Sequence, residues 1–252
     1  MIPAAVILAG SRGEPDPFAA SEGVAHKALI EIDGRPMLAR VADALRAAGV
    51  ARIAVSANDP AVVALAQSLG LEVLPTADGP SRSVGIAFAA LGAPMLVTTA
   101  DHALLRPEWV RQFVADIAPE TDVAVLLAER ETIEAAMPGS RRTYLKFADG
   151  DWSGCNLFHL ATPQAAHALD LWAQVEADRK RPWRIVRRFG VGTLLRYAIG
   201  RLTLAEAVSR LGATAGVRAG VVAARDGLAA VDVDKASDLV AVRALLTQRS
   251  TR

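Results

Sequence analysis

The sequence predicts an α/β fold, with a single three-layer domain built around a mostly parallel central sheet. Apolar runs of strand length alternate with helix-like segments through the first half of the chain. Strand, helix and strand repeated in this way favour right-handed crossovers and therefore parallel strands. The chain has 252 residues, 52% hydrophobic and 22% charged, so it can bury a large core and is not expected to be disordered.

The expected elements follow one another in a regular order. Strand-like runs cover residues 4–8, 52–56, 71–74, 95–98 and 122–127, and helix-like segments cover 37–48, 61–69, 84–91 and 109–117. Asp59 and Pro60 predict a helix that begins with an N-cap and a proline at its first position. Ligands of such sheets bind at the carboxyl ends of the strands. We therefore expect the turns at 8–13, 75–82 and 98–102 to face the ligand.

The first of these turns has the features of a phosphate-binding segment. Its small residues let backbone N–H groups approach a polyphosphate closely, and they follow a buried strand in the order Leu8, Ala9, Gly10 and Ser11. Arg12 and Lys27 would neutralise the phosphate charge. The G-x-G-x-x-G spacing of dinucleotide-binding domains is absent after Leu8, so that kind of site is less favoured.

This opening resembles the start of nucleotidyltransferases with a glycosyltransferase-A-like fold, whose usual form is L-A-G-G-x-S-x-R-M-G-x-x-K. The chain has one glycine fewer, and a longer segment of loop composition precedes Lys27. The resemblance is to the MobA-like NTP transferase family. It implies a Rossmann-like domain of the nucleotide-diphospho-sugar transferase type. The implied reaction transfers a nucleoside monophosphate from a nucleoside triphosphate to a sugar-, polyol- or cofactor-phosphate and releases pyrophosphate.

Two further segments resemble the metal-binding elements of that family. Asp101 follows the buried run 95–98, as in the x-x-D-x-P-L element whose aspartate binds magnesium. Residues 229–239 resemble D-[IV]-D-T-P-E-D-L, which supplies the second ligand. The resemblance implies Mg²⁺ on Asp101 and Asp232, since magnesium usually takes one or two protein carboxylates. Asp234 remains the alternative, because Lys235 and Ala236 replace the usual Thr-Pro. The implied catalytic set is Lys27, Arg12 and Asp101.

The segment 75–83 lies where the family reads the base and the ribose. Its small and polar side chains extend the expected nucleotide-binding set, which comprises Leu8, Ala9, Gly10, Ser11, Thr76, Ser81, Arg82, Ser83 and Thr99. Ser81 or Ser83 is also expected to cap the helix that starts there.

The single domain is expected to divide into a nucleotide-binding half, 1–130, and an acceptor-side half, 131–252. In the second half, 142–147 and 152–160 predict a hairpin that turns at residues 149–151. Lys146 and Asn156 are the candidate acceptor ligands. Cys155 has no histidine or aspartate at a recognisable spacing and is not expected to be a nucleophile. His159 and His167 are expected to be surface or packing residues.

A basic helical insertion is expected at about 161–213. Basic and aromatic residues gather at 179–188, an apolar stretch follows to 201, and Thr203 with Glu206 has the form of a capping box. The stretch 179–201 would suit a phosphorylated or lipid-like acceptor, a peripheral contact with an anionic membrane, or a solvated helical face. The net charge of +1 argues against a nucleic-acid partner.

We expect a cytoplasmic enzyme. The lone cysteine suits a reducing compartment, the N-terminus lacks signal-peptide features, and no apolar run approaches the ~20 residues of a membrane span. Two other readings stay open, namely a nucleotide-sugar-dependent glycosyltransferase on the same fold and a non-enzymatic nucleotide-binding regulatory domain.

Overall fold

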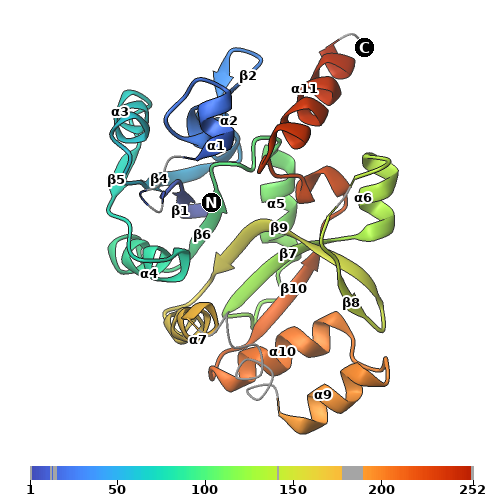
Figure 1. The fold of residues 1–252 in the computed structure, drawn as a ribbon. Helices are drawn as coiled ribbons and strands as arrows, with labels where there is room; N and C mark the ends of the chain where they lie inside the picture. Colours follow the sequence, from blue (N-terminus) through green and yellow to red (C-terminus); the bar gives the residue numbers. More distant parts are fainter. Residues whose placement is uncertain (1, 12, 14–15, 141, 178–189, 251–252) are drawn as a thin grey trace.

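The central sheet runs in the order β10-β7-β9-β6-β1-β4-β5, with β8 paired to β9, in the computed structural model shown in Figure 1. The structure describes residues 2–11, 13, 16–140, 142–177 and 190–250. The strands of this sheet are β1 (Ile2–Leu8), β4 (Val50–Ser56), β5 (Glu72–Leu74), β6 (Met95–Thr99), β7 (Val123–Glu129), β8 (Leu145–Phe147), β9 (Gly150–Leu160) and β10 (Ala219–Ala223). Pairing is parallel except along β9, which runs antiparallel to β6, β7 and β8. The predicted α/β fold with a mostly parallel sheet is confirmed.

The helices and short elements lie between these strands as the sequence predicts. The α-helices are α1 (Pro17–Ser21), α2 (Met37–Ala47), α3 (Pro60–Ser68), α4 (Pro80–Leu91), α5 (Pro107–Asp116), α6 (Arg130–Ala136), α7 (Ala165–Ala177), α9 (Val191–Ala198), α10 (Leu204–Thr214) and α11 (Ala236–Ser250). Two 3-10 helices, η1 (Lys27–Leu29) and η2 (Gly227–Ala230), and a small hairpin of β2 (Glu31–Ile32) and β3 (Arg35–Pro36) complete the described part of the chain. Asp59 caps α3 by accepting hydrogen bonds from the backbone of Ala61 and Val62, as expected.

Helices cover the sheet on both faces. Alternate residues of β1 point to opposite sides: Ala4 and Val6 pack with α4 and α7, and Ala5 and Ile7 pack into the larger core with α2 and α5. All four β1 side chains are at most 3% exposed. The result is the three-layer arrangement in which the strand ends, rather than the sheet faces, remain free for a site.

The hairpin of the second half forms, but its turn differs from the prediction. Phe147 pairs with Gly150, so Ala148 and Asp149 form the turn and Gly150 already belongs to β9. Gly150 has a φ of 132°, which a residue with a side chain rarely adopts. Asp149 instead accepts a hydrogen bond from the backbone N–H of Leu204 at the start of α10 (2.9 Å).

The region predicted as a helical insertion contains α7, α9 and α10, together with described residues that are not helical. It is not wholly an insertion, because Ala165 and Leu169 of α7 belong to the core on the α4 side. Thr203 accepts from the Glu206 N–H (3.2 Å), so the expected cap of α10 forms. No helix of the described residues is long and apolar enough to cross a membrane.

Candidate functional site

A lysine and two aspartates from distant segments meet at the carboxyl end of β6. Lys27 begins η1, Asp101 follows β6, and Asp234 follows η2. The Lys27 Nζ lies 2.5 Å from Asp101 Oδ2 and 2.8 Å from Asp234 Oδ1. The Asp101 side chain is 11% exposed and that of Asp234 is 58% exposed, so the cluster opens to solvent on the Asp234 side.

The electrostatics of this cluster reflect two carboxylates competing for one ammonium. Burial raises the pKa of Asp101, against the opposing effects of Lys27 and of the Thr99 hydroxyl, which donates to Asp101 Oδ1. Burial alone would lower the pKa of Lys27, but Asp101 and Asp234 outweigh it and raise that pKa. Burial likewise acts against ionisation of Asp234, and Lys27 outweighs it and lowers that pKa. Among the described residues, the cluster thus sets two carboxyl groups against one ammonium.

The nearby Asp232 has different partners. One carboxylate oxygen accepts from an Arg142 Nη2 at 2.8 Å, and the other accepts from Asn156 Nδ2 at 2.9 Å. Val233, between the two aspartates, is fully buried and donates its backbone N–H to Asp101 O (3.0 Å). The structure thus brings Asp234 to Lys27 and Asp101, and places the expected metal ligand Asp232 in a separate group with Arg142.

Asn156, a candidate acceptor ligand, is held in an uncommon conformation. Its φ is 48°, in the left-handed region that residues with side chains seldom occupy. Such strain is kept only where surrounding contacts fix it, and it is concentrated at functional sites. The other candidate, Lys146, lies exposed on β8 and forms no hydrogen bond or ion pair with any residue that the structure describes.

The turn after β1 is braced from the neighbouring strand end. Leu8 pairs with Thr99 across β1 and β6, and the Ala9 N–H donates to Ser56 O (2.9 Å). The Asn58 side chain forms two hydrogen bonds with the backbone of Ser11. Its Oδ1 accepts from the Ser11 N–H (2.9 Å), and its Nδ2 donates to Ser11 O (3.0 Å).

Gly10 of the same turn faces the segment expected to read the base. A Cβ at Gly10 would lie 3.0 Å from Thr76 Cγ2, so a side chain there would crowd Thr76. Arg12, the remaining expected catalytic residue, lies outside the described residues.

The serines of the segment 75–83 do not cap α4, contrary to the prediction. The N-cap of α4 is Gly79, and both serines are buried and engaged elsewhere. Ser81 Oγ donates to a carboxylate oxygen of Glu176 from α7 (2.6 Å), and Ser83 Oγ accepts from the Ala77 N–H (2.9 Å). Arg82 is 67% exposed, and its one ion pair with a described residue is to the exposed Asp78, at 3.5 Å.

His26 positions Lys27 and was not assigned a role from the sequence. The ring is buried, and its Nδ1 accepts from the Ala28 N–H (3.0 Å), which caps the short helix that Lys27 begins. Burial lowers the pKa of His26, so the ring is neutral and can accept this bond. In the sequence, the position of His26 directly before Lys27 was the one available sign of this role. Only the fold shows that the His26 ring is buried.

Cys155 and His102 are both buried. Burial raises the pKa of the Cys155 thiol to about 12, so the thiolate that a nucleophile needs does not form near neutral pH. Burial lowers the pKa of His102 to about 4 and keeps that ring neutral. His159 is 9% exposed within β9 and His167 is exposed on α7, in agreement with packing and surface positions.

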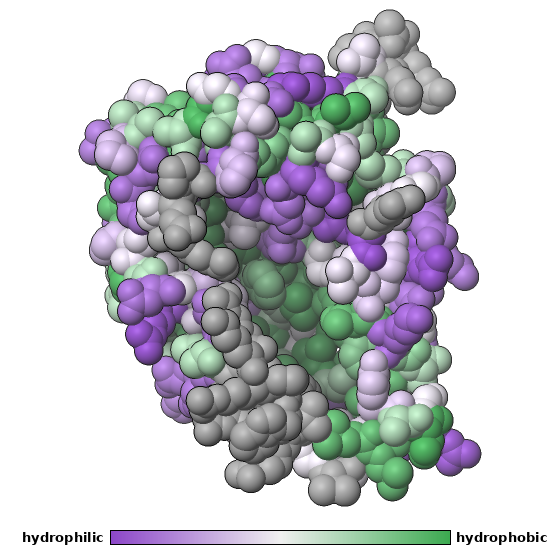
Figure 2. Space-filling view, viewed as in Figure 1, coloured by the Kyte–Doolittle hydropathy of each residue, from purple (hydrophilic) through white to green (hydrophobic). Residues whose placement is uncertain are grey.

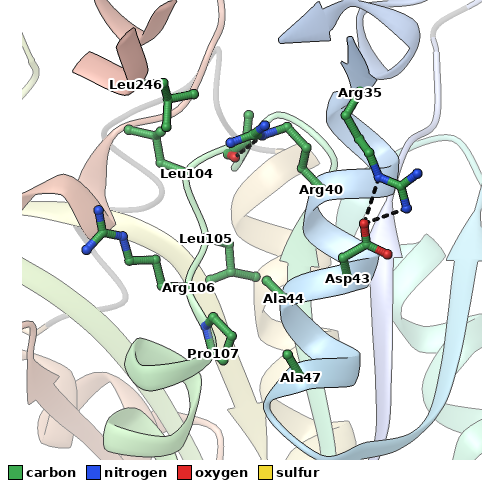
Figure 3. A pocket seen from close by; sticks show the side chains of 11 residues that line it. Arg35, Arg40, Asp43, Ala44, Ala47, Leu104, Leu105, Arg106, Pro107 and Leu246 are labelled. Atoms are coloured by element: carbon green, nitrogen blue, oxygen red, sulfur yellow. Dashed lines mark hydrogen bonds and ion pairs between the residues drawn. The ribbon is translucent and has the colours of Figure 1, made fainter. Parts of the chain in front are cut away.

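A cavity of about 380 Å³ adjoins the segment after Asp101. Figure 3 shows it between α2, the residues that lead into α5, and Leu246 of α11. Arg40 on its wall donates from Nε to Ala103 O and from Nη1 to Ile32 O, both at 3.2 Å. Arg40 therefore ties the segment that follows Asp101 to the one that follows Lys27.

With this geometry in place, the comparison with known families is decisive. The model of the MobA-like NTP transferase domain matches residues 5–188. The chain belongs to this family. The family resemblance is thereby confirmed; the matched range includes Leu8–Lys27 and Asp101 and ends before the C-terminal aspartates.

Solved structures agree with this assignment. A hypothetical transferase from Thermus thermophilus superposes with a TM-score of 0.81 at 34% identity, over 95% of this chain and 100% of that one. CMP:2-keto-3-deoxy-manno-octonic acid synthetase complexed with CTP gives a TM-score of 0.58 at 19% identity, over 98% and 99% of the two chains. A nucleotidyl transferase from Methanothermobacter gives 0.56 at 18% identity. The last two show a shared fold.

Curated relatives align with part of the MobA-like chain. The 3-deoxy-manno-octulosonate cytidylyltransferase of Rhodopseudomonas palustris is 34% identical over 119 residues, which are 44% of this chain and 49% of the relative. The enzyme of the same name from Neisseria meningitidis is 30% identical over 112 residues, 42% and 44% of the two. The chain spans about half the length of the curated relatives it matches.

Proposed function

We propose that this chain is a nucleotidyltransferase that joins a nucleoside monophosphate, taken from a nucleoside triphosphate, to a small anionic acceptor. The cluster of Lys27, Asp101 and Asp234 beside the turn after β1 carries the proposal. The two segments are adjacent, because the Ala100 N–H donates to Leu8 O (3.0 Å). A triphosphate bound at this turn would thus lie next to Lys27, which contacts both carboxylates.

The donor set of the cluster fits a magnesium ion. Asp101 and Asp234 offer hard carboxylate oxygens from two separate segments, and one ammonium balances only part of their charge. Magnesium takes one or two protein carboxylates and completes its shell with phosphate oxygens and water. We therefore propose Asp101 and Asp234 as its ligands, because both lie at Lys27, in place of Asp232, which lies with Arg142 and Asn156. The bound ion would neutralise phosphate charge.

The chain's own residues would position the triphosphate and stabilise the charge that develops during transfer. In the turn that Asn58 braces, the Gly10 N–H donates to no described residue and would face the triphosphate. An acceptor oxygen attacks the α-phosphorus, and the bond from that phosphorus to the bridging oxygen breaks, so pyrophosphate leaves with the bonding electrons. Lys27 would stabilise the charge that grows on the phosphate oxygens during this step. Catalysis then rests on positioning and charge neutralisation.

Arg142 and Asn156 support an anionic acceptor. The Arg142 side chain is 15% exposed and is held by Asp232, so its guanidinium is oriented for a carboxylate or phosphate group. Figure 2 shows a hollow in the middle of this face of the molecule, with a hydrophilic upper rim and an apolar floor. A phosphorylated sugar, polyol or cofactor fits this chemistry, as does a sugar acid like the one in the names of the cytidylyltransferase relatives. Those names favour CTP as the donor.

Thermal-shift measurements with each of the four ribonucleoside triphosphates and magnesium would test the nucleotide site. A bound triphosphate at ~100 times its dissociation constant stabilises the fold by roughly 2.7 kcal/mol. Pyrophosphate release is then measured with panels of phosphorylated and carboxylate acceptors. Asp101→Asn should abolish magnesium-dependent release, and Asp170→Asn, an exposed aspartate on α7, should not. Magnesium-dependent turnover that survives Asp101→Asn would remove this site from the mechanism.

A further inference from the structure

Large apolar side chains gather on the surface at α9. Leu195, Tyr197 and Ile199 lie in or directly after this helix and are 61%, 50% and 54% exposed. Leu145 of β8 is 52% exposed, and Phe147 of the same strand meets the Tyr197 ring edge-on at 6.0 Å between centroids. Figure 2 shows apolar surface at the end of the molecule where Figure 1 places α9. We call Leu145, Leu195, Tyr197 and Ile199 the α9 patch.

The α9 patch projects from the molecule. Every residue from 195 to 201 is exposed, whereas Thr193 before them and Leu202 after them are buried. Leu202 is tied to the β8–β9 hairpin, since its carbonyl accepts from the Ala148 N–H (2.9 Å). A projecting apolar edge of this kind is suited to a broad surface that covers it.

The charge around the α9 patch is positive. Arg201 is exposed and forms no ion pair with any described residue, and Glu206 is already paired with Arg196 (3.0 Å) and Arg210 (2.8 Å). Residues 190–214 together carry three arginines and one glutamate. A second copy of this chain would set like charges against each other, whereas an anionic lipid surface supplies the opposite charge.

We propose that the α9 patch docks on a bilayer that contains anionic lipids. Leu195, Tyr197 and Ile199 would enter the boundary between headgroups and acyl chains, and Arg201 would stay at the level of the lipid phosphates. A tyrosine suits this position because its ring is apolar and its hydroxyl is polar. The α9 patch lies outside the Lys27, Asp101 and Asp234 cluster, so docking can be tested apart from nucleotidyl transfer.

Co-sedimentation of the full chain with vesicles tests this proposal. Vesicles of phosphatidylcholine with about 30% phosphatidylglycerol should bind the chain, and vesicles of phosphatidylcholine alone should bind it at least about tenfold more weakly. Replacing Leu195, Tyr197 and Ile199 together with serine should weaken binding to the anionic vesicles by about tenfold or more. Val240→Ser is the matched control, since Val240 is 66% exposed on α11, and it should bind like the parent chain.

Three results would overturn the proposal. The first is no binding of the parent chain to anionic vesicles, and the second is equal binding by the triple variant. The third is a parent dimer in sedimentation velocity that the triple variant converts to monomers, which would assign the α9 patch to self-association. Thermal shifts by nucleotide and magnesium should be the same in all variants, which checks folding and keeps this test separate from the proposed transfer.

Discussion

Replacing Lys27 by methionine should lower stability in a way that depends on pH. The change takes the ammonium away from Asp101, whose side chain is 11% exposed, and from Asp234, which is 58% exposed. Removing one partner of a fully buried pair costs about 3–5 kcal/mol, and of an exposed pair about 0–1 kcal/mol. Because one carboxylate is nearly buried and the other is exposed, we expect Lys27→Met to lower the free energy of unfolding by about 2 kcal/mol near pH 8. For a chain of this size this corresponds to a decrease of about 4–8 °C in Tm.

The pH dependence follows from Asp101. Burial raises its pKa already, and loss of Lys27 would raise it further. A carboxyl group whose pKa is higher in the folded than in the unfolded chain destabilises the folded state at pH values above that pKa. The cost fades as the pH falls through it. The difference in Tm between the parent and Lys27→Met should therefore shrink on acidification from about pH 8 to about pH 5.

Scanning calorimetry or urea unfolding across this range would measure the effect. Lys235→Met is the matched control, because Lys235 is exposed one residue after Asp234 and forms no ion pair with a described residue. A Tm difference that does not change with pH, or the same loss in Lys235→Met, would refute the reasoning. In the transfer assay Lys27→Met should lower kcat by about 10²-fold or more, with a smaller effect on KM.

Three further sets of substitutions address the metal ligands, the phosphate turn and the packing. Asp234→Asn should raise the magnesium concentration needed for half-maximal turnover by about tenfold or more, and Asp232→Asn should mainly raise the KM of the acceptor; the reverse pattern would restore Asp232 as the ligand. Asn58→Ala should weaken nucleotide binding in thermal-shift titrations and cost about 1–2 kcal/mol of stability, because it removes both hydrogen bonds to the turn after β1. Gly227→Ala should lower the free energy of unfolding in urea by about 3 kcal/mol or more, because the new Cβ would lie 2.2 Å from a backbone oxygen of α6. Gly85→Ala is the control and should not destabilise the fold, because the space around Gly85 is open.

The sequence by itself determined the layered fold and the ends of its strands. Apolar runs and capping residues are local signals, so the expected start of α2 at Met37 and the cap of α3 at Asp59 agree with the structure. A parallel sheet brings successive strand ends to one edge, which is why the turn after β1 and Asp101 could be placed together from their positions in the chain, whereas the family resemblance placed Lys27 there. The hairpin of β8 and β9 was predicted from local signals, but the antiparallel pairing of β9 with β6 and β7 was not.

Only the tertiary structure decided between neighbouring side chains at the site. Asp232 and Asp234 have the same chemistry and differ in which segment each one faces, and that is fixed by Val233, buried and bonded to Asp101 O. Asn58 and Glu176 act on residues 47 and 95 positions away along the chain. Local spacing in the sequence cannot report such contacts, because they arise only when distant segments pack against one another.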